Sequence, residues 1–230
     1  MPGSALLRRA NAGHPMTEPD VALTDYGLVL ECAFLTGLLH RPATSRNQLR
    51  RLFALFLASS GIAALAGGTV HGFFLSEDSL IGAILWRCAL VALGLTAFAG
   101  WSIGGRLLFL EGTARAIEIT AGVEWIAYAV VVLAIDQHFW VAVVNYLPSV
   151  MFLGISLLTI YRRQRQKPVL AGLIGLALTI VAAIVQQRRL AFHPTYFNHN
   201  ALYHVIQMTS FVLIFLAGRH FIAGFAVAER

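Results

Sequence analysis

The sequence predicts an all-α, polytopic membrane protein with seven transmembrane helices. Of its 230 residues, 58% are hydrophobic and only 12% are charged, and the mean hydropathy is +0.72. A soluble domain carries about 25% charged residues, so this composition indicates a chain that lies largely in a membrane. Seven stretches are apolar over about 20 residues, which is the length that a helix needs to cross a bilayer. The net charge of +6 does not indicate a nucleic-acid partner, because the basic residues cluster between the apolar stretches.

The seven predicted spans leave only a short tail outside the membrane domain. Residues 1–20 are expected to form a polar tail that lacks the apolar core of a signal peptide. Residues 21–230 are expected to form one seven-helix bundle. The predicted spans are Val21–Leu39, Leu49–Phe74, Leu80–Ile103, Ala114–Ile135, Phe139–Tyr161, Val169–Gln186 and Ala201–Gly218.

Arginine residues set the predicted orientation. The links after spans one, three and five are rich in basic residues, among them Arg41, Arg46, Arg50, Arg51, Arg106, Arg162 and Arg163. Cytoplasmic loops carry an excess of Arg and Lys, so these links and the C-terminus are predicted to be cytoplasmic and the N-terminus to lie outside. Arginine supplies every basic residue except Lys167, which with the many Ala, Leu and Gly residues is typical of a GC-rich genome. We therefore expect the protein in a bacterial inner (plasma) membrane.

Polar side chains gather in the outer halves of the predicted spans. Ionisable groups inside a membrane usually face the bundle interior or a water-filled cavity. We therefore expect one polar cavity that opens toward the outside. The alternative is a network of hydrogen bonds that only holds the helices together. The residues expected at this site are Asp25, Glu31, His71, Arg87, Glu124, Asn145, His199, Asn200, His204 and Gln207.

The start of span seven, "FNHNALYHVIQ", is the most informative part of this set. Asn200, His204 and Gln207 are spaced by four and three residues, so they lie on one helix face. His199 precedes this face by about 100° of helix rotation. Together with His71 at a similar depth, His199 and His204 predict a catalytic zinc site, in which His ligands leave one position open for water.

The remaining polar residues have predicted roles around this metal. Asp25 or Glu31 would act as the general base, and Glu124 would handle protons or balance the charge of Arg87. Asn200 and Gln207 would fix the orientation of the imidazole rings, as groups behind metal ligands do. Arg87 and Asn145 complete the expected polar surroundings.

Two motifs carry a resemblance to a known superfamily. The seven spans, the acidic start of span one, "GTVHGF" around His71 and "FNHNALYHVIQ" resemble the CREST superfamily, which includes alkaline ceramidases and adiponectin-receptor-like proteins. The two motifs are most similar to an uncharacterised family with an HNxLYHxIQ pattern. The resemblance implies zinc-dependent hydrolysis of a lipid amide, with membrane lipids and a lipid-like substrate as partners. His71 and His204 match two of the superfamily's zinc ligands, while the third falls on Asn200, next to His199.

Three functions remain open from the sequence. The first is the zinc-dependent hydrolase, for which the resemblance also implies calcium at Asp25 and Glu31. The second is a non-enzymatic receptor or transporter that uses the same cavity. The third is a b-type cytochrome with His71 and His204 as axial haem ligands.

Overall fold

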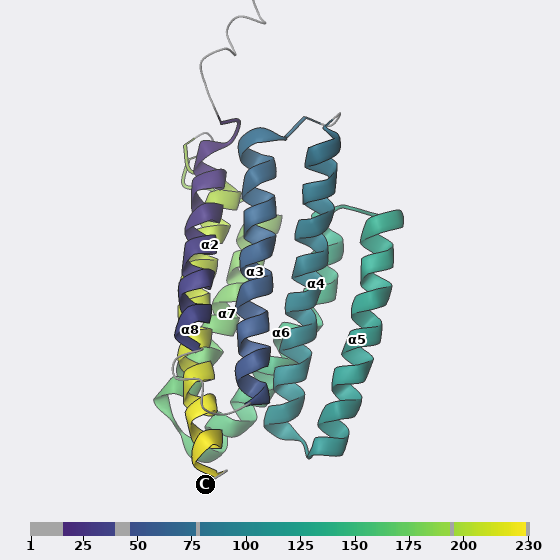
Figure 1. Cartoon of the computed structure of the whole chain (residues 1–230). Helices are drawn as coiled ribbons and strands as arrows, with labels where there is room; N and C mark the ends of the chain where they lie inside the picture. The colour runs from purple at the N-terminus through teal and green to yellow at the C-terminus, as the bar shows by residue number, and fades with distance from the viewer. Residues whose placement is uncertain (1–15, 40–46, 77–78, 194–195, 229–230) are drawn as a thin grey trace, which may run out of the picture.

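The computed structural model describes residues 16–39, 47–76, 79–193 and 196–228, and within these residues it contains seven α-helices. All seven are long and apolar enough to cross a membrane, which confirms the predicted all-helical, seven-span fold (Figure 1). They are α2 (Pro19–Leu39), α3 (Gln48–Phe73), α4 (Leu80–Leu108), α5 (Glu111–Ala134), α6 (Phe139–Gln164), α7 (Lys167–Gln187) and α8 (His199–Ala228).

Several helices extend beyond the apolar stretches that predicted them. Helix α4 continues to Leu108 and α8 to Ala228, past the predicted ends at Ile103 and Gly218. Hydropathy marks the part of a helix that lies in hydrocarbon, whereas the backbone hydrogen bonds continue until a residue breaks them. Helix α2 begins at Pro19, because proline is well suited to the first position of a helix. Most of the predicted tail, residues 1–15, lies outside the described residues.

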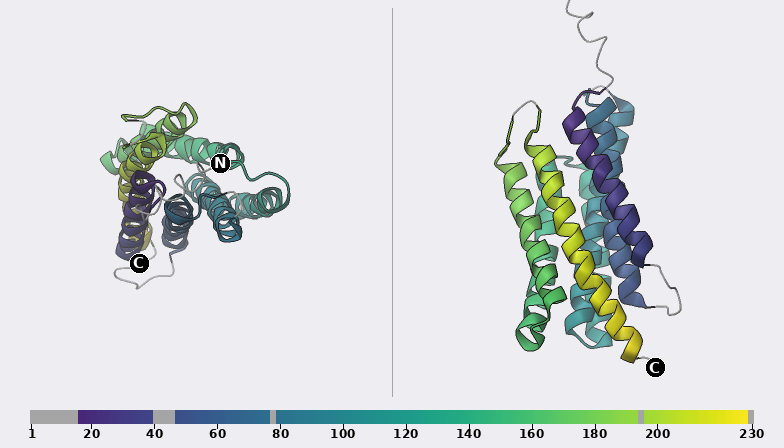
Figure 2. Two further views of the ribbon diagram at one scale, coloured as in Figure 1. Left: turned by 90° about the horizontal axis from the view of Figure 1, so that it is seen from above. Right: turned by 90° about the vertical axis from the view of Figure 1, so that its left-hand side faces the viewer.

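The helices form two rows (Figure 2). Helices α2, α3, α4 and α5 follow one another in the first row, and α6, α7 and α8 form the second. The rows join where α8 packs against α2 and where α6 packs against α4. Helix α5 packs mainly against α4 at one edge of the bundle. We call the end at which α2 begins and α3 ends the upper end, as in Figure 1.

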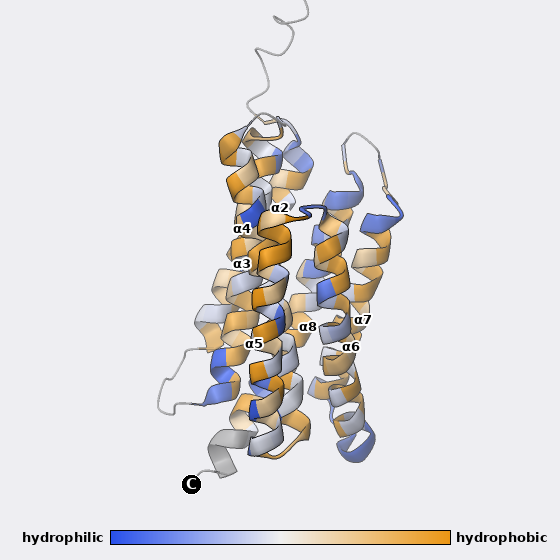
Figure 3. Ribbon diagram, turned by 90° about the vertical axis from the view of Figure 1, so that its right-hand side faces the viewer, coloured by the Kyte–Doolittle hydropathy of each residue, from blue (hydrophilic) through white to orange (hydrophobic). Residues whose placement is uncertain are grey.

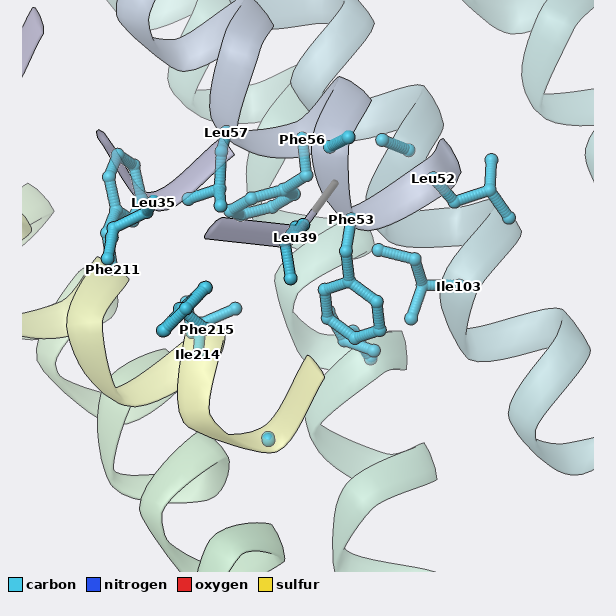
Figure 4. Packing of buried hydrophobic residues seen from close by; sticks show 14 of the residues in the cluster. Leu35, Leu39, Leu52, Phe53, Phe56, Leu57, Ile103, Phe211, Ile214 and Phe215 are labelled. Atoms are coloured by element: carbon cyan, nitrogen blue, oxygen red, sulfur yellow. The ribbon is translucent and has the colours of Figure 1, made fainter. Parts of the chain in front are cut away.

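A hydrophobic core closes the lower half of the bundle. Large side chains from the two rows interlock there, including Phe53, Phe56, Ile103, Phe211 and Ile214 (Figure 4). Small residues let the helices approach closely at the same level. A Cβ atom added to Gly175 of α7 would lie 2.8 Å from the backbone oxygen of Ser210 of α8. A smaller core in the upper half packs α5 against α4 and α6, through Leu90, Tyr128, Val132, Val141 and Ala142.

The outer surface of the bundle is apolar, as expected for contact with lipid. Along α5, Ile119, Val123, Ile126 and Val130 are each more than half exposed. Figure 3 shows hydrophobic residues along most of the helices, with the most hydrophilic ones mainly near the helix ends. This distribution agrees with seven membrane-crossing helices.

Candidate functional site

An internal cavity of about 170 Å³ lies between the two rows in the upper half of the bundle. Six helices line it, and α5 is the one that does not. The lining residues of α3 run from Ser60 to His71, which corresponds to a depth of about 16 Å along the helix axis. Most of the lining is apolar, and its polar members include Asp25, His204 and Gln207. The cavity thus has the shape and surface of a site for a molecule with an apolar body and a polar group.

A buried carboxyl–imidazole pair joins α2 to α8 at the wall of this cavity. The Nε2 atom of His204 lies 3.2 Å from Oδ1 of Asp25, and Asp25 is only 3% exposed. The other ring nitrogen, Nδ1, lies 3.2 Å from the hydroxyl of Thr24, which also lies 2.9 Å from the carbonyl oxygens of Asp20 and Val21. Thr24 therefore fixes the orientation of the ring.

The chain brings Asp25 to this place by a close approach of α2 and α3. A Cβ atom added to Gly68 would lie 2.6 Å from the Cβ atom of Asp25, so only glycine fits there without a shift. The neighbouring Gly67 has more room, because its nearest neighbour would be Oδ2 of Asp25 at 3.8 Å. Gly67 and Gly68 thus allow α2 to approach α3 closely where Asp25 joins the cavity lining.

Gly68→Ala is therefore expected to destabilise the bundle, whereas Gly67→Ala is expected to be tolerated. The added methyl group at residue 68 pushes against Asp25 and separates α2 from α3, at a cost of about 1–2 kcal/mol. Thermal unfolding of the two variants in detergent micelles measures the difference. Equal stability of the two variants would show that α2 and α3 do not pack as described.

Three polar atoms of cavity-lining residues are buried without a partner. They are Oδ2 of Asp25, the phenol oxygen of Tyr146 and Oε1 of Gln207, from α2, α6 and α8 respectively. A buried polar atom without a hydrogen bond costs about 1–3 kcal/mol. Three such atoms around one cavity indicate a place where a polar molecule completes the hydrogen bonding.

His71 lies at the upper end of the same cavity. Its Nδ1 atom is 2.6 Å from Oε2 of Glu18, and its ring packs edge-on against Trp86. The backbone N–H groups of Thr17 and Glu18 donate to the carbonyl oxygens of Gly72 and His71, so the segment before α2 covers the end of α3. His71 is therefore a residue of the cavity mouth and is tied to the N-terminal segment.

The start of α8 is fixed by a cap that the sequence analysis did not identify. The side-chain oxygen of Asn198 accepts hydrogen bonds from the N–H groups of Asn200 and Ala201, and its own N–H donates to Asp20 of α2. Asparagine directly before an apolar helix is a typical N-cap, and this signal could have been used. The cap places Asn200 in the cavity lining, and His199 is half-buried outside that lining.

Five of the predicted site residues lie outside the cavity lining, namely His199 and the four residues Glu31, Arg87, Glu124 and Asn145. Glu31 follows Asp25 by six residues, which turns it about 240° around α2. Glu124 of α5 instead accepts a hydrogen bond from Asn145 of α6. Arg87 donates to the carbonyl oxygen of Ala83 in its own helix. The expectation of a single interior space for all of these groups is therefore wrong, because depth in a helix does not determine the direction of a side chain.

The predicted metal ligands are not assembled into a metal site. Among residues 16–39, 47–76, 79–193 and 196–228, no group of three or more His, Cys, Asp or Glu side chains is placed to hold a metal ion. Both ring nitrogens of His204 are engaged, by Asp25 and by Thr24, and His199 is not in the cavity lining, so His71 is the one predicted ligand in the lining with a ring nitrogen that makes no described contact. The donor set therefore does not fit the predicted zinc. Zinc, calcium and haem stay predictions from the sequence, and no chemical step is derived through them.

Seven membrane-length helices, six of which line a partly polar cavity, define an all-helical polytopic membrane protein. The chain belongs to the Family of unknown function (DUF6962), whose model matches residues 21–223. No curated protein and no solved structure is significantly similar to it. The family match covers all seven helices except the ends of α2 and α8.

Proposed function

We propose that this protein binds a small lipid-like molecule in the upper cavity and acts as a membrane receptor or transporter rather than as a hydrolase. The three unpartnered buried oxygens around one elongated apolar cavity carry this proposal. An apolar cavity of about 150 Å³ is large enough for a molecule such as benzene, so this cavity has room for a chain of about six carbons. The polar group of the molecule lies near Asp25, and its apolar body extends toward Phe211.

A photoreactive alcohol tests this proposal directly. The probe is a six-carbon alcohol with a diazirine at its far end, photolysed with the protein in lipid nanodiscs. It should label residues that line the cavity, and excess 1-hexanol should reduce this labelling. Peptide mass spectrometry locates the label.

Two alanine variants control for labelling from the lipid. Ala63 lines the cavity, and Ala63→Leu should abolish the cavity label because it fills the space. Ala127 of α5 is exposed on the outside of the bundle, and Ala127→Leu should label like the wild type. Label found only on lipid-facing residues such as Ile126, and unchanged in Ala63→Leu, would contradict the proposal.

We also propose the orientation in which the cavity opens to the outside of a bacterial inner membrane. The lower end of the bundle carries Arg106, Arg115, Arg162 and Arg163, and basic residues concentrate on the cytoplasmic side. The N-terminus then lies outside and the C-terminus lies in the cytoplasm. A ligand would enter from the outside or from the outer leaflet.

Cysteine labelling is expected to report opposite sides for the two ends of the bundle. In a background that lacks Cys32 and Cys88, a membrane-impermeant thiol reagent should reach Ser76→Cys in intact cells. It should reach Gln164→Cys only after the cells are opened. Both side chains belong to exposed residues, so accessibility in the fold does not limit either reaction. Labelling of Gln164→Cys in intact cells would reverse the orientation.

A further inference from the structure

The unpartnered atoms of the cavity indicate which chemical group it takes. Oδ2 of Asp25 and Oε1 of Gln207 are both oxygens, and an amide or ionised carboxylate oxygen only accepts hydrogen bonds. Neither has a donor in the described structure. An alkylammonium group brings three N–H donors and one positive charge, so its hydrogen-bonding groups are the kind that these acceptors lack. A carboxylate head group would place another acceptor against them.

Aromatic rings in the same cavity lining favour the same group. Trp86, Phe139 and Tyr203 all line the cavity. The ring centre of Phe139 lies 6.3 Å from that of Trp86 and 6.3 Å from that of Tyr203, so the three rings form a continuous wall. Tyr203 is also adjacent to the ring of His204, at 5.1 Å. A cation near the faces of aromatic rings is stabilised, more so where water is excluded.

The charge of the Asp25–His204 pair determines what must leave when a cation enters. In the empty cavity the pair is neutral overall when it holds one dissociable proton, either on the carboxyl group or as imidazolium beside carboxylate. An ammonium ion that enters this buried place would add an uncompensated positive charge. That charge is costly unless the proton of the pair leaves. The other ionisable side chains in the lining are His71, whose Nδ1 is bound to Glu18, and the phenols Tyr146 and Tyr203. Glu31, Arg87 and Glu124 are outside the lining.

We propose that the cavity binds an alkylammonium ion in exchange for one proton of the Asp25–His204 pair. The proposal rests on the proposed ligand-binding function and names the chemical class of the ligand. One ammonium enters, one proton passes to the solution, and the net charge of the cavity is unchanged. Asp25 then remains as the counter-ion of the ammonium, and His204 remains neutral with its ring held by Thr24.

Binding of n-hexylamine, 1-hexanol and hexanoate to the protein in nanodiscs tests this exchange. The amine stays protonated below about pH 10, as a lysine side chain does. The ammonium should bind roughly ten- to a hundredfold more tightly than the alcohol, as expected for hydrogen bonds to a charged group. Hexanoate should bind less well than 1-hexanol. Calorimetry in buffers of different ionisation enthalpy should report release of about one proton per amine.

The pH dependence of binding gives a test that needs no variant. Because the proton competes with the ammonium, affinity for hexylamine should rise with pH, by up to about tenfold per pH unit while the pair still holds its proton. Affinity for 1-hexanol should not change in this way. Asp25→Asn should lose the preference for the amine and the proton release, and it should still bind 1-hexanol.

The outcomes separate this inference from the function on which it rests. Equal affinity for hexylamine and 1-hexanol would overturn the assignment of the head group. It would not contradict the proposal that the cavity binds a small lipid-like molecule. Tight amine binding without proton release or pH dependence would overturn the exchange. If Ala63→Leu does not abolish the binding of any of the three molecules, the proposed ligand-binding function itself is wrong.

Discussion

Replacing His204 with alanine is expected to lower the free energy of unfolding by about 2–4 kcal/mol, because it leaves the buried carboxyl group of Asp25 without its hydrogen-bond partner and leaves a space where the ring was. The side chains of the pair are 11% and 4% exposed, so solvent does not compensate for the loss. Unfolding of the variant in detergent micelles, followed by circular dichroism, measures this change.

Two further variants show whether the cost comes from the unpaired carboxyl group. His220→Ala on the same helix should cost much less, since His220 packs against Phe221 and is more exposed. The double variant Asp25→Leu, His204→Leu should recover much of the lost stability, because an apolar pair can replace a buried polar pair at little cost. If the double variant is as unstable as the sum of the single ones, the two residues do not act as a pair.

Arg106→Ala is expected to have the second largest effect, about 2–3 kcal/mol. The guanidinium group donates to Glu118 at 2.6 Å and to Glu111 at 2.9 Å, and Gln48 of α3 also donates to Glu118. Arg106 therefore connects α4 to α5 at the lower end. It is 11% exposed and Glu118 is 26% exposed, so the cost falls below that of a fully buried pair.

Arg115→Ala provides the matched control for Arg106. Arg115 lies on α5 in the same region but is exposed, and charges on exposed side chains contribute little to stability. Its removal should change the unfolding free energy by less than about 0.5 kcal/mol. An equal loss in both variants would indicate a general effect of positive charge at the lower end rather than a specific ion pair.

The helices could be predicted from the sequence because their signal is local. A run of about 20 apolar residues is sufficient evidence for a span, and all seven predicted spans correspond to helices. The ends were less well predicted. Arg219 and His220 interrupt the apolar run that predicted the last span, but α8 continues through them to Ala228.

The depth of the site residues was also predictable, but the directions of their side chains were only partly so. Asn200, His204 and Gln207 line the cavity together, as their helical spacing predicted. Glu124 and Asn145 have a similar depth but meet each other between α5 and α6. The rotation of one helix relative to another depends on packing across the bundle, and a single helix sequence does not encode it.

Other residues of the site could not be predicted, because no pattern in the sequence marked them. Thr24 looks like one of many hydroxyl residues in apolar spans, and its contact with His204 depends on how α2 and α8 meet. Glu18 precedes the first span and was assigned to the polar tail, yet it binds His71. The aromatic residues Trp86 and Phe139 resemble lipid-facing residues in sequence, although they line the cavity.

The central claim, that the cavity beside Asp25 and His204 holds a small lipid-like molecule, is tested most directly by native mass spectrometry. Wild-type protein released from nanodiscs should carry a single bound 1-hexanol when the alcohol is supplied with trace zinc, and Ala63→Leu should carry none. Wild-type protein that takes up zinc and no alcohol, and loses the zinc in His204→Ala, would contradict this account. It would support the zinc site that the sequence predicted.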